Sequence, residues 1–67
     1  MMFLRKRRVR IHLKDETRSL EGIWVGYAAG HYRLVAAEQL EEIGRTIPVD
    51  GEAWIPRERV LYVQVLG

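Results

Sequence analysis

The sequence predicts an all-β fold of the small-barrel type, with five strands and a short helical turn between strands three and four. Three observations lead to this prediction: apolar–polar alternation near the N-terminus, a long run of β-branched and aromatic residues interrupted by glycines, and an Asp-Gly pair between two apolar runs. The 67 residues suffice for one core. We therefore expect one domain over residues 9–67, preceded by a basic arm over residues 1–8.

The first three strands are expected over residues 9–14, 18–28 and 31–37. In the first, Val, Ile and Leu alternate with Arg, His and Lys, which is the period of a strand with one buried face. Gly22 and Gly26 lie inside the second strand and indicate a bulge or bend. Ala29-Gly30 predicts a tight turn into the third.

One short helical turn is expected over residues 38–45. Apolar residues recur there at spacings of three and four, and Gly44 stands where a C-cap glycine would. In such a turn Glu41 and Arg45 would form an i,i+4 ion pair of the favourable orientation.

A hairpin and a final strand are expected in the C-terminal part. Asp50-Gly51 lies between two apolar runs and is the strongest hairpin signal of the chain, with positive φ expected at both residues. A 3₁₀-like turn is expected at residues 57–59, after Pro56. Residues 60–66 then form a strand with two largely apolar faces, as in a central barrel strand or one covered by a neighbouring subunit.

The formal net charge of +2 hides an asymmetry along the chain. Five of the eleven basic residues belong to the N-terminal part: Arg5, Lys6, Arg7, Arg8 and Arg10. Residues 11–67 carry six basic and nine acidic side chains, a net charge of −3, and thus lack the broad positive field of a nucleic-acid-binding face. Two interpretations of the arm carry equal weight: a solvated, frayed terminus, or an electrostatic grip on nucleic-acid phosphates or an acidic protein surface.

Composition excludes several sources of stability and function. The chain has no cysteine, and its only histidines are His12 and His31, too few for the usual zinc sites. We expect no metal, no cofactor and no membrane span, and a location in the cytoplasm. Because so small a core is seldom sufficient alone, oligomerisation or docking on a larger assembly is favoured.

Residues suited to catalysis are scarce. Ser19 is the only serine, and nothing in the sequence places a histidine beside it, so we expect no enzyme. Besides the basic residues above, the candidate partner-binding residues are the large aromatics Trp24, Tyr32, Trp54 and Tyr62. For the tryptophans a core position is favoured over a docking surface by about two to one.

The order of elements resembles the SH3-like small barrels and, within them, the Sm and Sm-like proteins. The resemblance runs from Val9 to Val65 and is carried by the apolar positions of the first strand, by Leu20-Glu21-Gly22-Ile23 and by the apolar residues around the expected 3₁₀-like turn. The resemblance implies an SH3-like small-barrel fold. The RNA-contacting positions depart from the Sm pattern, since Asp15 precedes Glu16 where glycine is usual and Pro56-Arg57 replace the usual Arg-Gly, so RNA binding is not implied.

The Gly30-His31-Tyr32 turn and the closing stretch IPRERVLYVQV at residues 55–65 also resemble small accessory proteins encoded among the virion structural genes of tailed phages of actinobacteria. That resemblance implies a minor capsid or connector-associated role and incorporation into the virion. The sequence therefore predicts a non-enzymatic interaction module that packs against copies of itself or a larger shell protein. The alternative is an Sm-like oligomeric ring that binds RNA through the arm and the loop near His31.

Overall fold

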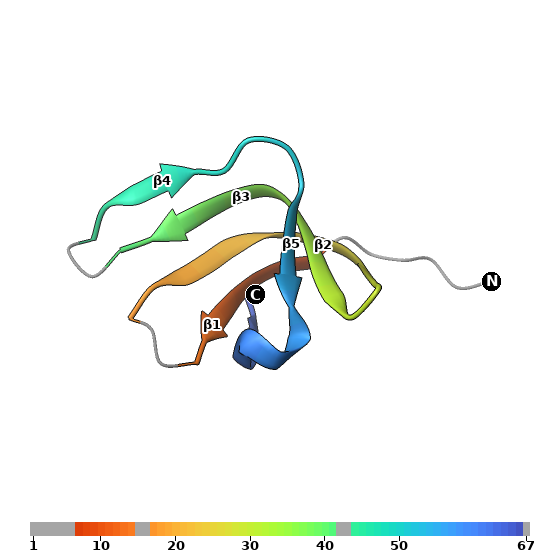
Figure 1. The fold of residues 1–67 in the computed structure, drawn as a ribbon. Helices are drawn as coiled ribbons and strands as arrows, with labels where there is room; N and C mark the ends of the chain where they lie inside the picture. Colours follow the sequence, from red (N-terminus) through yellow and green to blue (C-terminus); the bar gives the residue numbers. More distant parts are fainter. Residues whose placement is uncertain (1–6, 15–16, 42–43, 67) are drawn as a thin grey trace.

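The computed structural model describes residues 7–14, 17–41 and 44–66, and these residues form an all-β fold, as predicted. All strand pairs are antiparallel (Figure 1). The elements are β1 (Arg7–Leu13), β2 (Ser19–Ala28), β3 (His31–Leu40), β4 (Thr46–Pro48), β5 (Ala53–Pro56), the 3₁₀ turn η1 (Arg57–Arg59) and β6 (Val60–Val65).

The strands form one curved sheet in the order β4-β3-β2-β1-β6, and β5 also pairs with β3. The long strand β3 thus carries β4 along its C-terminal part and β5 along its N-terminal part. Within the described residues β5 and β6 have no pairing with each other, so the sheet is open there. The described residues form six strands where the sequence predicted five, and β4 and β5 lie one after the other along β3.

The core lies on the inner, concave face of the sheet. Its buried hydrophobic side chains come from β1, β3 and β5: Val9, Ile11, Leu34, Ala37 and Ile55. Gly22 on β2 allows the closest approach, because a Cβ there would stand 3.0 Å from the Ala37 Cα and 3.0 Å from the Val35 carbonyl oxygen. The pairing of β2 with β3 also shifts register on either side of Trp24, which confirms the predicted irregularity of this strand.

The tight turn predicted at Ala29-Gly30 is confirmed. It joins β2 to β3, with Ala28 directly opposite His31. Ala29 and Gly30 both have positive φ, 51° and 73°, which is the conformation of a type I′ turn whose twist matches that of the flanking strands.

The helical turn predicted over residues 38–45 is wrong for residues 38–40, and residues 42 and 43 lie outside the described residues. Residues 38–40 continue β3 and pair with both β2 and β4, so strand neighbours satisfy the backbone groups that a helical turn would have used locally. The Glu41 amide then donates to the Arg45 carbonyl at 2.9 Å, and the two side chains form an ion pair at 3.3 Å. The expected pair therefore exists, but it closes a hairpin loop.

The hairpin predicted at Asp50-Gly51 is also wrong. The strands on either side of this pair, β4 and β5, bond to β3 and not to each other. Gly51 has a φ of 74°, whereas Asp50 has no positive φ. The pair therefore forms a bend between β4 and β5, the two strands that run along β3. Opposite this bend, Ala36 of β3 has a positive φ of 51°.

The predicted 3₁₀ turn and final strand are present, but among the described residues β6 pairs with β1 alone and is an edge strand, not a central one. The turn η1 lies beside the C-terminal end of β1 (Figure 1), where the Lys14 amide donates to the Arg59 carbonyl at 2.9 Å. The predicted basic arm lies partly outside the described residues, which begin at Arg7, and β1 already includes Arg7 and Arg8. No helix of the described residues is long and apolar enough to cross a membrane.

Candidate docking site

Trp54 stands on the outer face of the sheet, at the exposed edge formed by β5. It is directly opposite Arg33 of β3, and 48% of its surface is exposed. The indole Nε1 donates to Glu52 Oε1 at 2.8 Å. The ring is thus accessible and yet held in one orientation.

The same carboxylate oxygen also binds Arg33. Arg33 Nε donates to Glu52 Oε1, and the guanidinium lies 5.4 Å from the centroid of the Trp54 ring, within the range of a cation–π contact. The His31 ring lies on the other flank, with its centroid 5.8 Å from that of Trp54. We call these four residues, His31, Arg33, Glu52 and Trp54, the Trp54 cluster.

The charges of the Trp54 cluster stabilise one another. The hydrogen bond from Arg33 is the main cause that lowers the pKa of Glu52, and the bond from the Trp54 indole acts in the same direction. In return, the hydrogen bond to Glu52 raises the pKa of Arg33. At neutral pH the carboxylate is therefore ionised and holds both the guanidinium and the indole.

A second exposed aromatic residue, Tyr62, lies on β6 next to β1. Tyr62 is 52% exposed and stacks on His12, with ring centroids 4.3 Å apart. His12 Nε2 lies 2.9 Å from Gln64 Oε1. His12 is also opposite Ser19 in the ladder between β1 and β2, a proximity that the sequence did not predict, but its ring is engaged with β6.

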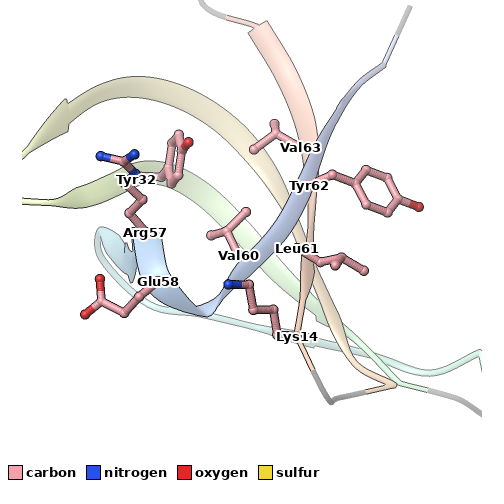
Figure 2. Close-up of a pocket in the computed structure, with 8 residues that line it drawn as sticks. All are labelled: Lys14, Tyr32, Arg57, Glu58, Val60, Leu61, Tyr62 and Val63. Atoms are coloured by element: carbon pink, nitrogen blue, oxygen red, sulfur yellow. The ribbon is translucent and has the colours of Figure 1, made fainter.

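A groove of about 510 Å³ lies at the open side of the sheet, beside η1 and the start of β6. Figure 2 shows Val60 and Val63 pointing to the same side as Tyr32, whereas Leu61 and Tyr62 point away from it. Lys14, Arg57 and Glu58 complete the lining. The groove is thus mixed in character, with apolar side chains between charged ones.

Two of the three basic residues described on β1 share one carboxylate within the sheet, so only part of their positive charge is neutralised. Arg8 and Arg10 both form ion pairs with Glu21 of β2, at 2.6 and 2.7 Å, and only 13% of the Glu21 side chain is exposed. The hydrogen bonds from Arg10 and then Arg8 lower the pKa of this carboxyl. Arg7 is exposed, and Arg5 and Lys6 lie outside the described residues.

The remaining predicted residues lie on the other face. Trp24 is opposite Leu34, so it shares the inner face, opposite to that of Trp54. It is 38% exposed, and its indole donates to the Gly26 carbonyl at 2.8 Å. Tyr32 is half-buried against Tyr27, with ring centroids 5.0 Å apart. The structure therefore distributes the predicted aromatics over both faces.

Only Trp54 of this cluster was a candidate partner-binding residue; His31 was named for binding only through the loop of the RNA-binding alternative, and two members were missed altogether. Arg33 and Glu52 are 19 positions apart, and only the pairing of β5 with β3 brings them together. The spacing of Glu52 and Trp54, two residues apart in a strand, was the one local signal, because such residues share a face.

The cluster has the chemistry of a docking site. Among the described residues, no group of three or more His, Asp or Glu side chains could hold a metal ion. A half-exposed tryptophan beside an arginine instead has the composition that dominates binding energy in protein interfaces. In comparisons with known proteins, no family model matches this chain, and neither does any curated protein.

Proposed function

We propose that this chain is a non-enzymatic interaction module that docks a protein partner on the Trp54 cluster. The observation that carries the proposal is a half-exposed indole whose orientation is set by Glu52 and Arg33. Ordering a mobile side chain at an interface costs about 0.5 to 1.5 kcal/mol. Because Trp54 is already ordered, a partner would not have to supply that energy.

The charges of the site favour a partner with an apolar centre. Arg33 and Glu52 neutralise each other beside the ring, so the cluster presents an aromatic surface rimmed by one balanced ion pair. Interfaces commonly have this arrangement, with an apolar anchor at the centre and polar groups around it. An extensively charged ligand would find no complementary field here.

The specific version of the proposal is a minor capsid or connector-associated protein of a tailed phage particle, built on an SH3-like small barrel. The curvature of the sheet, the bend between β4 and β5 and the 3₁₀ turn before β6 support that barrel class. Fold class does not determine function, so the particle role depends on the sequence resemblance, and the docking role depends on the cluster.

The second candidate is an Sm-like oligomeric ring that binds RNA through the basic N-terminal part and the loop near His31. Arg8 and Arg10 weigh against it, because each already has Glu21 as its partner. Two guanidiniums on one carboxylate leave about one positive charge from this pair for phosphates, in addition to that of Arg7, and each phosphate contact contributes about −0.7 to −0.9 to the salt slope. Protein docking is therefore the first choice.

The test uses purified proteins encoded by the genes adjacent to the gene for this chain. We expect at least one to bind in titration calorimetry, and Trp54→Ala to weaken that binding at least tenfold, as for an interface hot spot. Trp24→Ala is the matched control, because its indole lies on the opposite face, and it should bind as the parent does. Binding that is lost in the Trp24 variant and kept in the Trp54 variant would refute the assignment.

Single-stranded RNA serves as the second probe in the same experiment. Tight, base-selective binding that survives replacement of Arg5, Lys6, Arg7, Arg8 and Arg10 by Gln would favour the Sm-like candidate. The folded domain would then be the part that recognises the bases. Weak binding that disappears on adding salt is the expected result.

A further inference from the structure

Strand β6 has one edge that no strand covers among the described residues. It pairs with β1 alone, and the Leu66 amide donates to the Arg8 carbonyl at 2.9 Å. Alternate residues of an antiparallel strand bond to the same neighbour. Tyr62 and Gln64 therefore also direct their backbone groups toward β1.

The residues between them direct their backbone groups the opposite way. The described peptide bonds include no cis bond, and in a planar trans peptide the C=O and the following N–H point in opposite directions. The N–H and C=O of Val63 and of Val65, and the C=O of Leu61, thus face away from β1. Residues 60–66 include no charged residue, proline or glycine, so nothing on this edge prevents pairing with another strand.

The other free edge of the sheet, along β4 and β5, is protected. The amides of Val49 and Arg57 donate toward β3 and the turn before it, each at 2.9 Å. By the same alternation, the backbone nitrogens of Pro48 and Pro56 point away from β3, toward the free edge. Neither proline has an N–H to donate. Prolines at outward-facing edge positions are a common means by which proteins prevent edge pairing.

We propose that two copies of this chain pair through β6, antiparallel about a twofold axis that passes through Val63. Val63 of each copy then donates to and accepts from Val63 of the second copy. The Val65 amide donates to the Leu61 carbonyl of the second copy, and the reverse bond follows by symmetry. These four bonds use the outward backbone groups of Val63, Val65 and Leu61, and Tyr62 lies opposite Gln64 of the second copy.

The occupant is a second copy because β6 complements itself. Position 63 is the middle of residues 60–66, so this register overlaps the two segments along their whole length. An uncharged strand meets no like charge when a twofold axis places it against itself. Tyr62 and Leu61, which are 52% and 61% exposed, would lose water-accessible apolar surface. Nothing in this pairing requires the Trp54 cluster, which lies on the other side of the sheet opening.

The first test measures oligomeric state by sedimentation equilibrium on the full chain. One strand pair is smaller than a standard interface, so we expect a dimer with a Kd on the order of 10 to 100 µM and a melting temperature that rises with protein concentration. Val65→Pro removes an outward amide and leaves the bonds to β1 intact, and it should weaken the dimer at least tenfold. A monomer at millimolar concentration with a concentration-independent melt would overturn the proposal.

A charge exchange tests the register without altering the backbone. Tyr62→Lys with Gln64→Lys places like charges opposite each other across the twofold axis and should abolish the dimer. Tyr62→Lys with Gln64→Glu places opposite charges there and should restore it. Failure of the second pair to restore the dimer, with both variants folded by circular dichroism, would exclude this register.

Two further variants separate this proposal from partner docking and from the other edge. Ile47→Lys makes the same kind of change on exposed β4, and Trp54→Ala alters the Trp54 cluster. Both should dimerise as the parent does. Loss of the dimer in either one would move the self-association interface away from β6.

Discussion

The two faces of the sheet are stabilised by different means. On the inner face, buried aliphatic side chains pack closely, and Gly22 lies against Ala37 with no room for a Cβ. On the outer face, Glu21 binds two arginines of β1, and Glu52 binds one arginine and one indole. The inner contacts are van der Waals contacts, and the outer ones are hydrogen-bonded ion pairs.

This difference separates stability from recognition. Close packing responds to a change of one methyl group, because the surrounding atoms have nowhere to move. Solvent-accessible ion pairs such as that of Arg33 with Glu52 contribute little to the free energy of unfolding, but they orient the side chains around them. The outer face can therefore present an ordered Trp54 at small cost to stability.

The largest expected effect comes from filling the tightest contact of the inner face. Gly22→Ala would place a methyl group 3.0 Å from the Ala37 Cα and the Val35 carbonyl oxygen, and we expect a loss of about 1 to 3 kcal/mol in unfolding free energy. Gly26→Ala is the matched control on the same strand, because its Cβ would meet only an Arg33 side-chain nitrogen, at 3.6 Å. Urea denaturation of both measures the difference. Equal midpoints would mean that β2 and β3 can separate at no cost.

A smaller effect is expected at the bend between β4 and β5. Gly51 has a φ of 74° with no atom near its missing Cβ, so a substitution there affects backbone strain alone. Gly51→Val should cost about 1 kcal/mol, since β-branched residues strongly disfavour positive φ. Gly51→Asn should cost less, because asparagine tolerates this conformation. If valine and asparagine gave the same denaturation midpoint, strain would not be the cause.

The smallest effect on stability is expected from acid titration of the outer face. The arginine hydrogen bonds lower the pKa of both Glu52 and Glu21 from the ordinary value near 4.5. Their stabilisation is complete above that value and is lost as the pH falls through the lowered pKa of each folded carboxyl.

The two carboxyls can be distinguished by fluorescence. In a Trp24→Phe background, the emission of Trp54 should change as Glu52 is protonated and releases the indole. Glu52→Gln should remove that transition, whereas Glu21→Gln should leave it in place. A transition that persists in the Glu52 variant would assign the change to another group.

Local patterns predicted the parts of this fold that local geometry determines. Alternation predicted β1, and Ala29-Gly30 predicted the turn after β2. The 3₁₀ turn after Pro56 was also predicted from a local feature, the end of a strand at proline. In each case the residues that form the structure are neighbours in the sequence.

Tertiary pairing decided the rest. Residues 38–40 carried a helical signal but extend β3, and the Asp50-Gly51 pair carried a hairpin signal but lies between β4 and β5, which both pair with β3. A long central strand offers backbone partners that a short local structure lacks. The Trp54 cluster likewise depends on the register of β5 against β3, which brings Arg33 opposite Trp54. The sequence by itself determined most of the strands and the Ala29-Gly30 turn. Only the tertiary structure decided which strands pair and which side chains meet, since pairing depends on contacts between distant residues.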